Sequence, residues 1–142
     1  MATYISRSDI AATLAEEAKQ GKRELEPFKS RMKLKNVPLS IVEDTAVFDS
    51  KAEMHQKSAD LWHCLEGEVI FTVGGKLRNG APRMLPDGTV DENEWRSAAI
   101  DDGEDITLRK GDWLFIPAGE PHTHRATGTA RLLIAKIPSL HA

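Results

Sequence analysis

The sequence predicts an all-β protein, an antiparallel sandwich or barrel, with one short helix near its N-terminus. Two observations carry this prediction: short β-favouring apolar runs recur from about Leu39 onward, and turn signals such as Gly74-Gly75 separate them. The runs are Leu39–Glu43, Ala46–Phe48, Leu61–Leu65, Val69–Val73, Ile106–Leu108, Trp113–Ile116 and Arg131–Ile137. Their spacing is typical of several short strands that form one core.

Residues 9–20 are expected to form the helix. Ser8 or Asp9 can cap it, alanine and glutamate favour it, and Gly21 follows where a C-terminal cap belongs. Its apolar stripe consists of Ile10, Leu14 and Ala18. Such a narrow stripe suits a helix that covers the end or edge of a sheet.

The chain divides into an N-terminal arm, residues 1–36, and a barrel, residues 37–138. Residues 22–36 are basic and broken by Pro27, so they are interpreted as a connection with a short strand. Residues 78–105 are turn-rich and acidic, and we expect a long loop insertion there. This loop is either a solvated excursion or a lid that places Trp95 or Met84 over a pocket, with a short helix at 91–97.

Composition limits the class of protein. A chain of 142 residues is expected to fold as one domain. Its net charge of −3, from 19 basic and 22 acidic residues, argues against nucleic acid or an anionic membrane as a partner. It contains no apolar stretch near the length of a membrane span. The single cysteine, Cys64, excludes an internal disulfide and predicts a cytoplasmic location.

Residues 111–122 are the most informative segment. Gly111 opens a tight turn, a short apolar strand follows, and Pro117 ends that strand. Gly119 allows a second sharp turn, which Pro121 stiffens just before His122. A stiff turn fixes the direction of the imidazole, as a metal or catalytic site requires.

Partners for His122 are expected from the segment 53–67. Glu53 and His55 lie two apart in an extended run and therefore share one face. After a short turn, Asp60 is the first inward residue of the next strand, whereas His63 lies on the opposite face of that strand. His124 has the same parity as His122. His141 lies near the end of the chain and is expected to fray.

These two segments resemble the two motifs of the cupin superfamily. The second motif, G-x5-P-x-G-x2-H-x3-N, is matched at all positions except the last, where Ala126 replaces asparagine. The first motif, G-x5-H-x-H-x3–4-E-x6-G, is matched with changes. The matched positions are Gly111, Pro117, Gly119 and His122 in the second motif and His55, Asp60 (for Glu) and Gly67 in the first. The first histidine is replaced by Glu53 and the opening glycine by Val47.

The resemblance implies a cupin double-stranded β-helix, also called a jelly-roll barrel, and a homodimer. It also implies one divalent metal ion inside the barrel, of unknown identity among Fe, Mn, Ni, Zn and Cu. The implied ligands are His55, Asp60, His122 and Glu53. Because Glu53 replaces a histidine, the set resembles two histidines with one carboxylate, which leaves coordination positions open.

We therefore expect a metal-dependent enzyme that acts on a small organic molecule by oxygenase, isomerase or lyase chemistry, decarboxylation included. Glu53 and His124 are the expected catalytic residues, because a carboxylate and an imidazole can both move protons. Glu53 either binds the metal or acts as a base. The alternatives are a non-catalytic cupin that binds or senses a small ligand and a barrel whose site has decayed.

Overall fold

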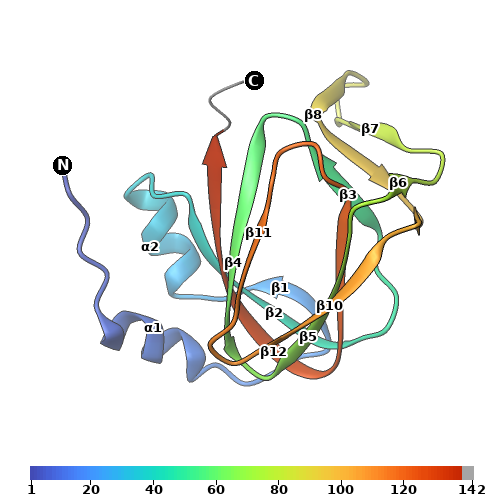
Figure 1. Cartoon of the computed structure of the whole chain (residues 1–142). Helices are drawn as coiled ribbons and strands as arrows, with labels where there is room; N and C mark the ends of the chain where they lie inside the picture. Colours follow the sequence, from blue (N-terminus) through green and yellow to red (C-terminus); the bar gives the residue numbers. More distant parts are fainter. Residues whose placement is uncertain (139–142) are drawn as a thin grey trace.

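A computed structural model describes residues 1–138 of the chain (Figure 1). The expectation for His141 lies outside the described residues. The elements, in chain order, are α1 (Arg7–Leu14), β1 (Gly21–Glu24), α2 (Phe28–Leu34), β2 (Leu39–Val47), β3 (Ala52–His55), β4 (Ser58–Glu66), β5 (Glu68–Val73), β6 (Lys76–Leu77), β7 (Ala81–Met84), β8 (Val90–Ser97), β9 (Ile100–Asp101), β10 (Glu104–Arg109), β11 (Trp113–Ile116) and β12 (His122–Pro138).

Two antiparallel half-sheets share the long strand β12 and form the barrel (Figure 1). The first has the order β1-β2-β12-β4-β11, and the second has the order β7-β8-β3-β12-β5-β10. Strand β12 passes from one half to the other at a register shift between Ala126 and Thr129. The predicted all-β jelly roll with a short N-terminal helix is confirmed.

The core lies between the half-sheets. Alternation along β4 turns Trp62 and Cys64 inward, where they are buried, while His63 faces outward as predicted. The remaining buried members come from β5, β10, β11 and β12 and are Val69, Phe71, Val73, Leu108, Ile116, Ala126, Ala130, Leu132 and Ile134. Polar side chains occupy the rest of the interior, and they form the candidate site.

Helix α1 is shorter than the predicted helix and begins earlier. Ser6, rather than Ser8 or Asp9, is the N-cap, and the Asp9 side chain completes a capping box with it. The chain leaves the helical path after Leu14 because Arg131 of β12 binds the carbonyl oxygens of Leu14 and Glu16. Neither helix within residues 1–138 is long and apolar enough to cross a membrane.

Helix α2 was not predicted, whereas the short strand expected in residues 22–36 is β1. The helix starts directly after Pro27. The proline was interpreted as a break in the chain, but proline is also tolerated where a helix begins. Phe28 and Met32 on its inner side are buried against Leu25 and Ile41 of the barrel. Helix α2 therefore covers the outer face of the first half-sheet, beside β2 (Figure 1).

The predicted loop insertion at 78–105 is wrong, and so is the short helix at 91–97. The segment contains β7, β8 and β9, and β8 pairs with β3 at the edge of the second half-sheet. Its acidic residues are tolerated in a strand because Arg83 forms ion pairs with Asp91 and Glu94. Neither Trp95 nor Met84 lines the main cavity, so the segment does not close over it as a lid.

Gly67, the closing glycine of the first motif, is required by a close approach of two strands. Its φ is +73°, and a Cβ atom at this position would lie 2.0 Å from the carbonyl oxygen of Thr129. The contact falls where β12 bends between the half-sheets. Any other residue would push β12 away from β4.

A buried ion network ties the N-terminal arm to the barrel. The Glu43 carboxylate of β2 is fully buried and accepts hydrogen bonds from Arg131, Arg23 and the backbone N–H of Lys19. Arg131 is also buried, and it holds the end of α1 through the carbonyl contacts described above. The arm is therefore fixed by charge as well as by the apolar contacts of α2.

Replacing Glu43 with glutamine should destabilise the protein by about 3–5 kcal/mol, because it leaves the buried Arg131 without its buried counter-charge and with only the partly exposed Glu66 carboxylate at 3.7 Å. Urea unfolding would measure the loss. Glu68→Gln, which removes an exposed ion pair with Arg109, is the control and should cost about 1 kcal/mol or less. Equal losses in the two variants would contradict the role of the network.

Candidate metal centre

His122 lies at the start of β12 with its ring fixed by the turn before it. Its Nδ1 atom lies 3.0 Å from the carbonyl oxygen of Glu120, so Nδ1 carries the proton and donates it there. Nε2 then faces the carboxylates of Glu53 and Asp60 inside the barrel. The Gly119 N–H also donates to the carbonyl oxygen of His55 at 2.7 Å, which joins the two motifs directly.

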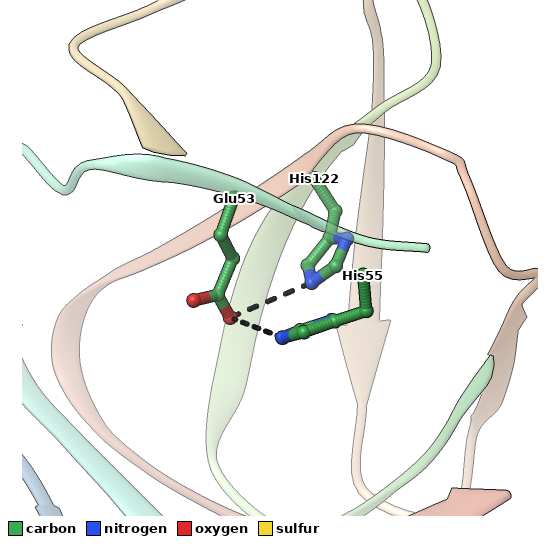
Figure 2. A group of neighbouring side chains, drawn as sticks. All are labelled: Glu53, His55 and His122. Carbon is green, nitrogen blue, oxygen red and sulfur yellow. Dashed lines mark ion pairs between the residues drawn. The ribbon is translucent and has the colours of Figure 1, made fainter. Parts of the chain in front are cut away.

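Glu53 and His55 project from β3 toward His122, as their shared face predicts (Figure 2). The Glu53 Oε1 atom lies 3.6 Å from His122 Nε2 and 4.0 Å from His55 Nε2. One ligand atom from each of the three residues falls within 4.8 Å of the others, and both histidines are buried. The three side chains can therefore hold one metal ion.

Asp60 approaches the same histidines from β4, in the other half-sheet. Its Oδ2 atom lies 3.3 Å from His122 Nε2 and 3.9 Å from His55 Nδ1. Its other oxygen, Oδ1, accepts a hydrogen bond from Lys136 Nζ at 2.7 Å. Sequence reasoning missed Lys136, although its parity with the inward Ile134 on β12 could have indicated it.

Glu94 is the second residue that sequence reasoning missed. It lies directly opposite His55 in the pairing of β3 with β8, and its Oε1 atom is 3.3 Å from His55 Nε2. Its other oxygen forms ion pairs with Arg83 and Arg96. It was missed because residues 91–97 were expected to be helical and part of a loop.

Three buried atoms at this centre have no hydrogen-bond partner: His55 Nδ1, Asp60 Oδ2 and His122 Nε2. Buried polar atoms are normally satisfied, so their convergence fits a bound cation. Two donor sets share His122 Nε2. One adds His55 Nε2 and Glu53, and the other adds His55 Nδ1 and Asp60. In the second set, Glu94 would accept the proton on His55 Nε2 and orient that ring.

The protonation states follow from the close packing of acid and base. Burial opposes ionisation of Glu53 and Asp60, but the charged His122 ring close to both outweighs it and holds the pKa of each at about 2. Burial likewise disfavours charged His122, yet the nearby carboxylates of Asp60 and Glu53 and the hydrogen bond to the Glu120 carbonyl raise its pKa to about 9, so a bound metal would replace the proton on Nε2. Burial and nearby Lys136 lower the pKa of His55, so that ring is neutral.

His124 points inward as predicted, but it lies beside the group of Glu53, His55 and His122 rather than in it. Its Nδ1 atom is 2.5 Å from the Asp44 Oδ2 atom, and the Trp62 and Phe71 rings pack against it with centroids 5.0 Å away. Lys22 Nζ lies 2.7 Å from Nδ1 but also 3.5 Å from Nε2, so it does not lie along the direction of the Nδ1 lone pair. Asp44, rather than Lys22, is therefore the hydrogen-bond partner of Nδ1.

An open cavity of about 760 Å³ lies beside the candidate metal centre and is lined by two of the residues described above, Glu53 and His124. Its inner wall includes Glu53, His124 and Trp62, and its mouth lies between β1 and α2. The full lining is Lys22, Arg23, Glu24, Lys29, Lys33, Val37, Pro38, Leu39, Ser40, Val42, Glu53, Trp62, His124, Ile134 and Lys136. A small molecule can therefore reach Glu53 and His124 from the side of the N-terminal arm.

Residues 97–136 match the family model described as a cupin domain. The chain has a cupin-like fold. The predicted resemblance to the cupin superfamily is confirmed over these residues.

Solved structures share this fold. A structure of oxalate oxidase studied for its mechanism is 15% identical, with a TM-score of 0.55 over 89% of this chain and 57% of that one. Recombinant oxalate oxidase with glycolate is 15% identical, with a TM-score of 0.51 over 83% and 50%. The chain thus spans about half the length of these proteins, and at such identities the likeness shows the fold alone. No curated protein sequence matches the chain.

The low pKa of Glu53 predicts how metal-free protein responds to acid. A carboxyl group whose pKa is lowered on folding stabilises the protein above its unfolded pKa, here 4.5, and this contribution is lost as the pH falls through about 2. Wild type should therefore exceed Glu53→Gln by roughly 1–2 kcal/mol at pH 6, a value reduced for partial exposure.

Urea unfolding from pH 6 to pH 2 would follow this difference, which should shrink toward zero in acid. Glu104→Gln, an exposed change on β10, serves as the control and should show no such pH dependence. A constant difference between wild type and Glu53→Gln would show that His122 does not hold the Glu53 carboxylate in its charged form.

Proposed function

We propose that this cupin is a metal-dependent enzyme that acts on a small organic molecule inside the barrel. The observation that carries the proposal is the convergence of three unpartnered buried atoms, on His55, Asp60 and His122, beside Glu53, which itself lines an open cavity. A purely structural site has no need of a ligand group that faces such a cavity. His55 and His122 with Glu53 or Asp60 would hold one divalent ion among Fe, Mn, Ni, Zn and Cu.

When bound, the metal supplies a Lewis acid for a substrate oxygen. The chain's own residues would move the protons. Asp44 holds the Nδ1 proton of His124, which leaves the Nε2 lone pair of that ring available as a base. Burial lowers the pKa of His124, so the ring is neutral at physiological pH and able to accept a proton. If Asp60 rather than Glu53 binds the metal, Glu53 is a second base.

One observation favours the alternative of a ligand-binding or sensing cupin without catalysis. Lys136 Nζ lies 2.7 Å from Asp60 Oδ1 and partly neutralises this carboxylate. A neutralised carboxylate binds a cation less strongly. The decisive question is therefore whether the purified protein binds a metal through these residues.

Metal titration tests the proposal. Adding Fe²⁺ or Mn²⁺ to chelator-treated protein at a hundred times its Kd should stabilise the fold by about 2.7 kcal/mol, a rise in Tm of roughly 10 °C. His122→Ala should abolish this rise, because His122 belongs to both donor sets. Replacing the carboxylate that binds the metal, by Glu53→Gln or Asp60→Asn, should weaken the metal affinity at least tenfold.

Glu104→Gln is the matched control for the titration and should bind metal like wild type. Elemental analysis of protein purified without chelator should give about one ion per chain. No ion, and no rise in Tm with any of the five metals, would reject the metalloenzyme in favour of the ligand-binding alternative.

We further propose a homodimer formed through an exposed apolar face. Trp113 and Phe115 on β11 are 58% and 55% exposed, and His63 stacks on Trp113 with ring centroids 3.9 Å apart. Strand β11 ends the first half-sheet, so one of its edges has no neighbour. A second copy would bury both the aromatic face and this edge.

The single cysteine, Cys64, is buried and free, which supports a cytoplasmic location.

Sedimentation of Trp113→Asp tests the dimer. Wild type at micromolar concentration should sediment as twice the 15.7 kDa chain, and the variant should sediment as a monomer. Phe48→Asp, which changes another exposed aromatic residue remote from β11, should remain a dimer. Monomeric wild type, or dimeric Trp113→Asp, would contradict the proposed face.

A further inference from the structure

We propose that the cavity binds a small organic anion, a carboxylic acid with an apolar body, whose charged group is attracted by the basic wall near α2. The proposal rests on the proposed function only in placing the other end of the molecule at the candidate metal centre. It names the chemical class of ligand, and it can be tested in protein without metal.

The charge of the lining carries the first step. Five basic and two acidic side chains line the cavity, although the whole chain has a net charge of −3. The basic ones are Lys22, Arg23, Lys29, Lys33 and Lys136, and the acidic ones are Glu24 and Glu53. A concave wall with an excess of one sign concentrates ligands of the opposite sign.

The mouth has charge that no neighbour cancels. Among residues 1–138, Lys33 has no ion pair within 4.0 Å, and Lys29 reaches only Glu24, at 4.0 Å. Both lysines come from α2, with their side chains toward the cavity. An anion at the mouth therefore gains attraction without breaking an existing ion pair.

Two further ammonium groups lie deeper and are held in place by buried carboxylates. Lys22 contacts Asp44 at 3.2 Å, and Lys136 contacts Asp60 at 2.7 Å. The carboxylates are buried, but the side chains of Lys22 and Lys136 are 31% and 42% exposed and face the cavity. Lys22 Nζ also donates to the carbonyl oxygen of His124 at 2.7 Å, so its third N–H and the remaining N–H groups of Lys136 can serve a ligand oxygen.

The rest of the wall indicates an organic acid rather than a sugar or an inorganic ion. Val42, Trp62 and Ile134 offer apolar surface between the basic groups and Glu53. Ser40 is the one hydroxyl among the lining residues, which include no asparagine, glutamine, threonine or tyrosine. A sugar needs several neutral donors and acceptors, so this wall fits an apolar body that carries a carboxylate.

Calorimetry on chelator-treated protein tests the proposal with three acids and their neutral amides: hexanoate, glutarate and phenylacetate against hexanamide, glutaramide and phenylacetamide. At least one acid should bind about tenfold more tightly than its amide, and 0.5 M salt should remove most of this preference. Lys29→Glu with Lys33→Glu should also remove it, and the fold should tolerate both changes because the two side chains are exposed at the mouth of the cavity.

Lys110→Glu, an exposed change in the turn before β11, is the control and should leave the preference intact. Equal binding of every acid and its amide, or an unchanged preference in the α2 double variant, would overturn the proposal. Tighter binding of inorganic phosphate than of all three acids would overturn it too. Because metal is absent throughout, these outcomes are independent of whether the chain binds a metal ion.

Discussion

The fold depends on the pairing of one strand, β12, with four others. Its first part, residues 122–125, lies between β3 and β5, and after the bend near Ala126 it lies between β2 and β4. The barrel closes because a single chain segment belongs to both half-sheets. The same strand carries His122, His124 and Lys136, so the candidate site is fixed by the backbone hydrogen bonds that hold the barrel together.

The interior of this barrel is polar at one end, and each buried charge has a partner. Glu43 lies with Arg131, Asp44 with His124 and Lys22, and Asp60 with Lys136. Buried charges are retained only when paired, so these groups form a connected set of acids and bases. Seven buried side-chain atoms of the described residues have no hydrogen-bond partner, and three of them, on His55, Asp60 and His122, belong to the candidate metal centre. Their convergence distinguishes the site, because Asp60 Oδ2 lies 3.3 Å from His122 Nε2 and 3.9 Å from His55 Nδ1.

The sequence predicted the barrel and most of the cluster because local rules govern both. Strand parity correctly placed Glu53 beside His55, and the Gly119 turn placed His122. Helix α2 and the strands at 78–105 could not be predicted in the same way. They are stabilised by contacts distant in sequence, such as Arg83 with Glu94. The partners Lys136 and Glu94 were missed for the same reason, because cross-strand register is not encoded in any short segment.

The place of β1 and α2 at the mouth of the cavity separates two tasks along the chain. The groups that can hold a metal come from the strands after residue 50, whereas two thirds of the residues that line the cavity come from 22–42. Chemistry and selectivity are thus encoded in different stretches of sequence. Descendants of this protein could change what they admit by altering the arm while the metal ligands stay untouched, and a designer could exchange the arm for the same purpose.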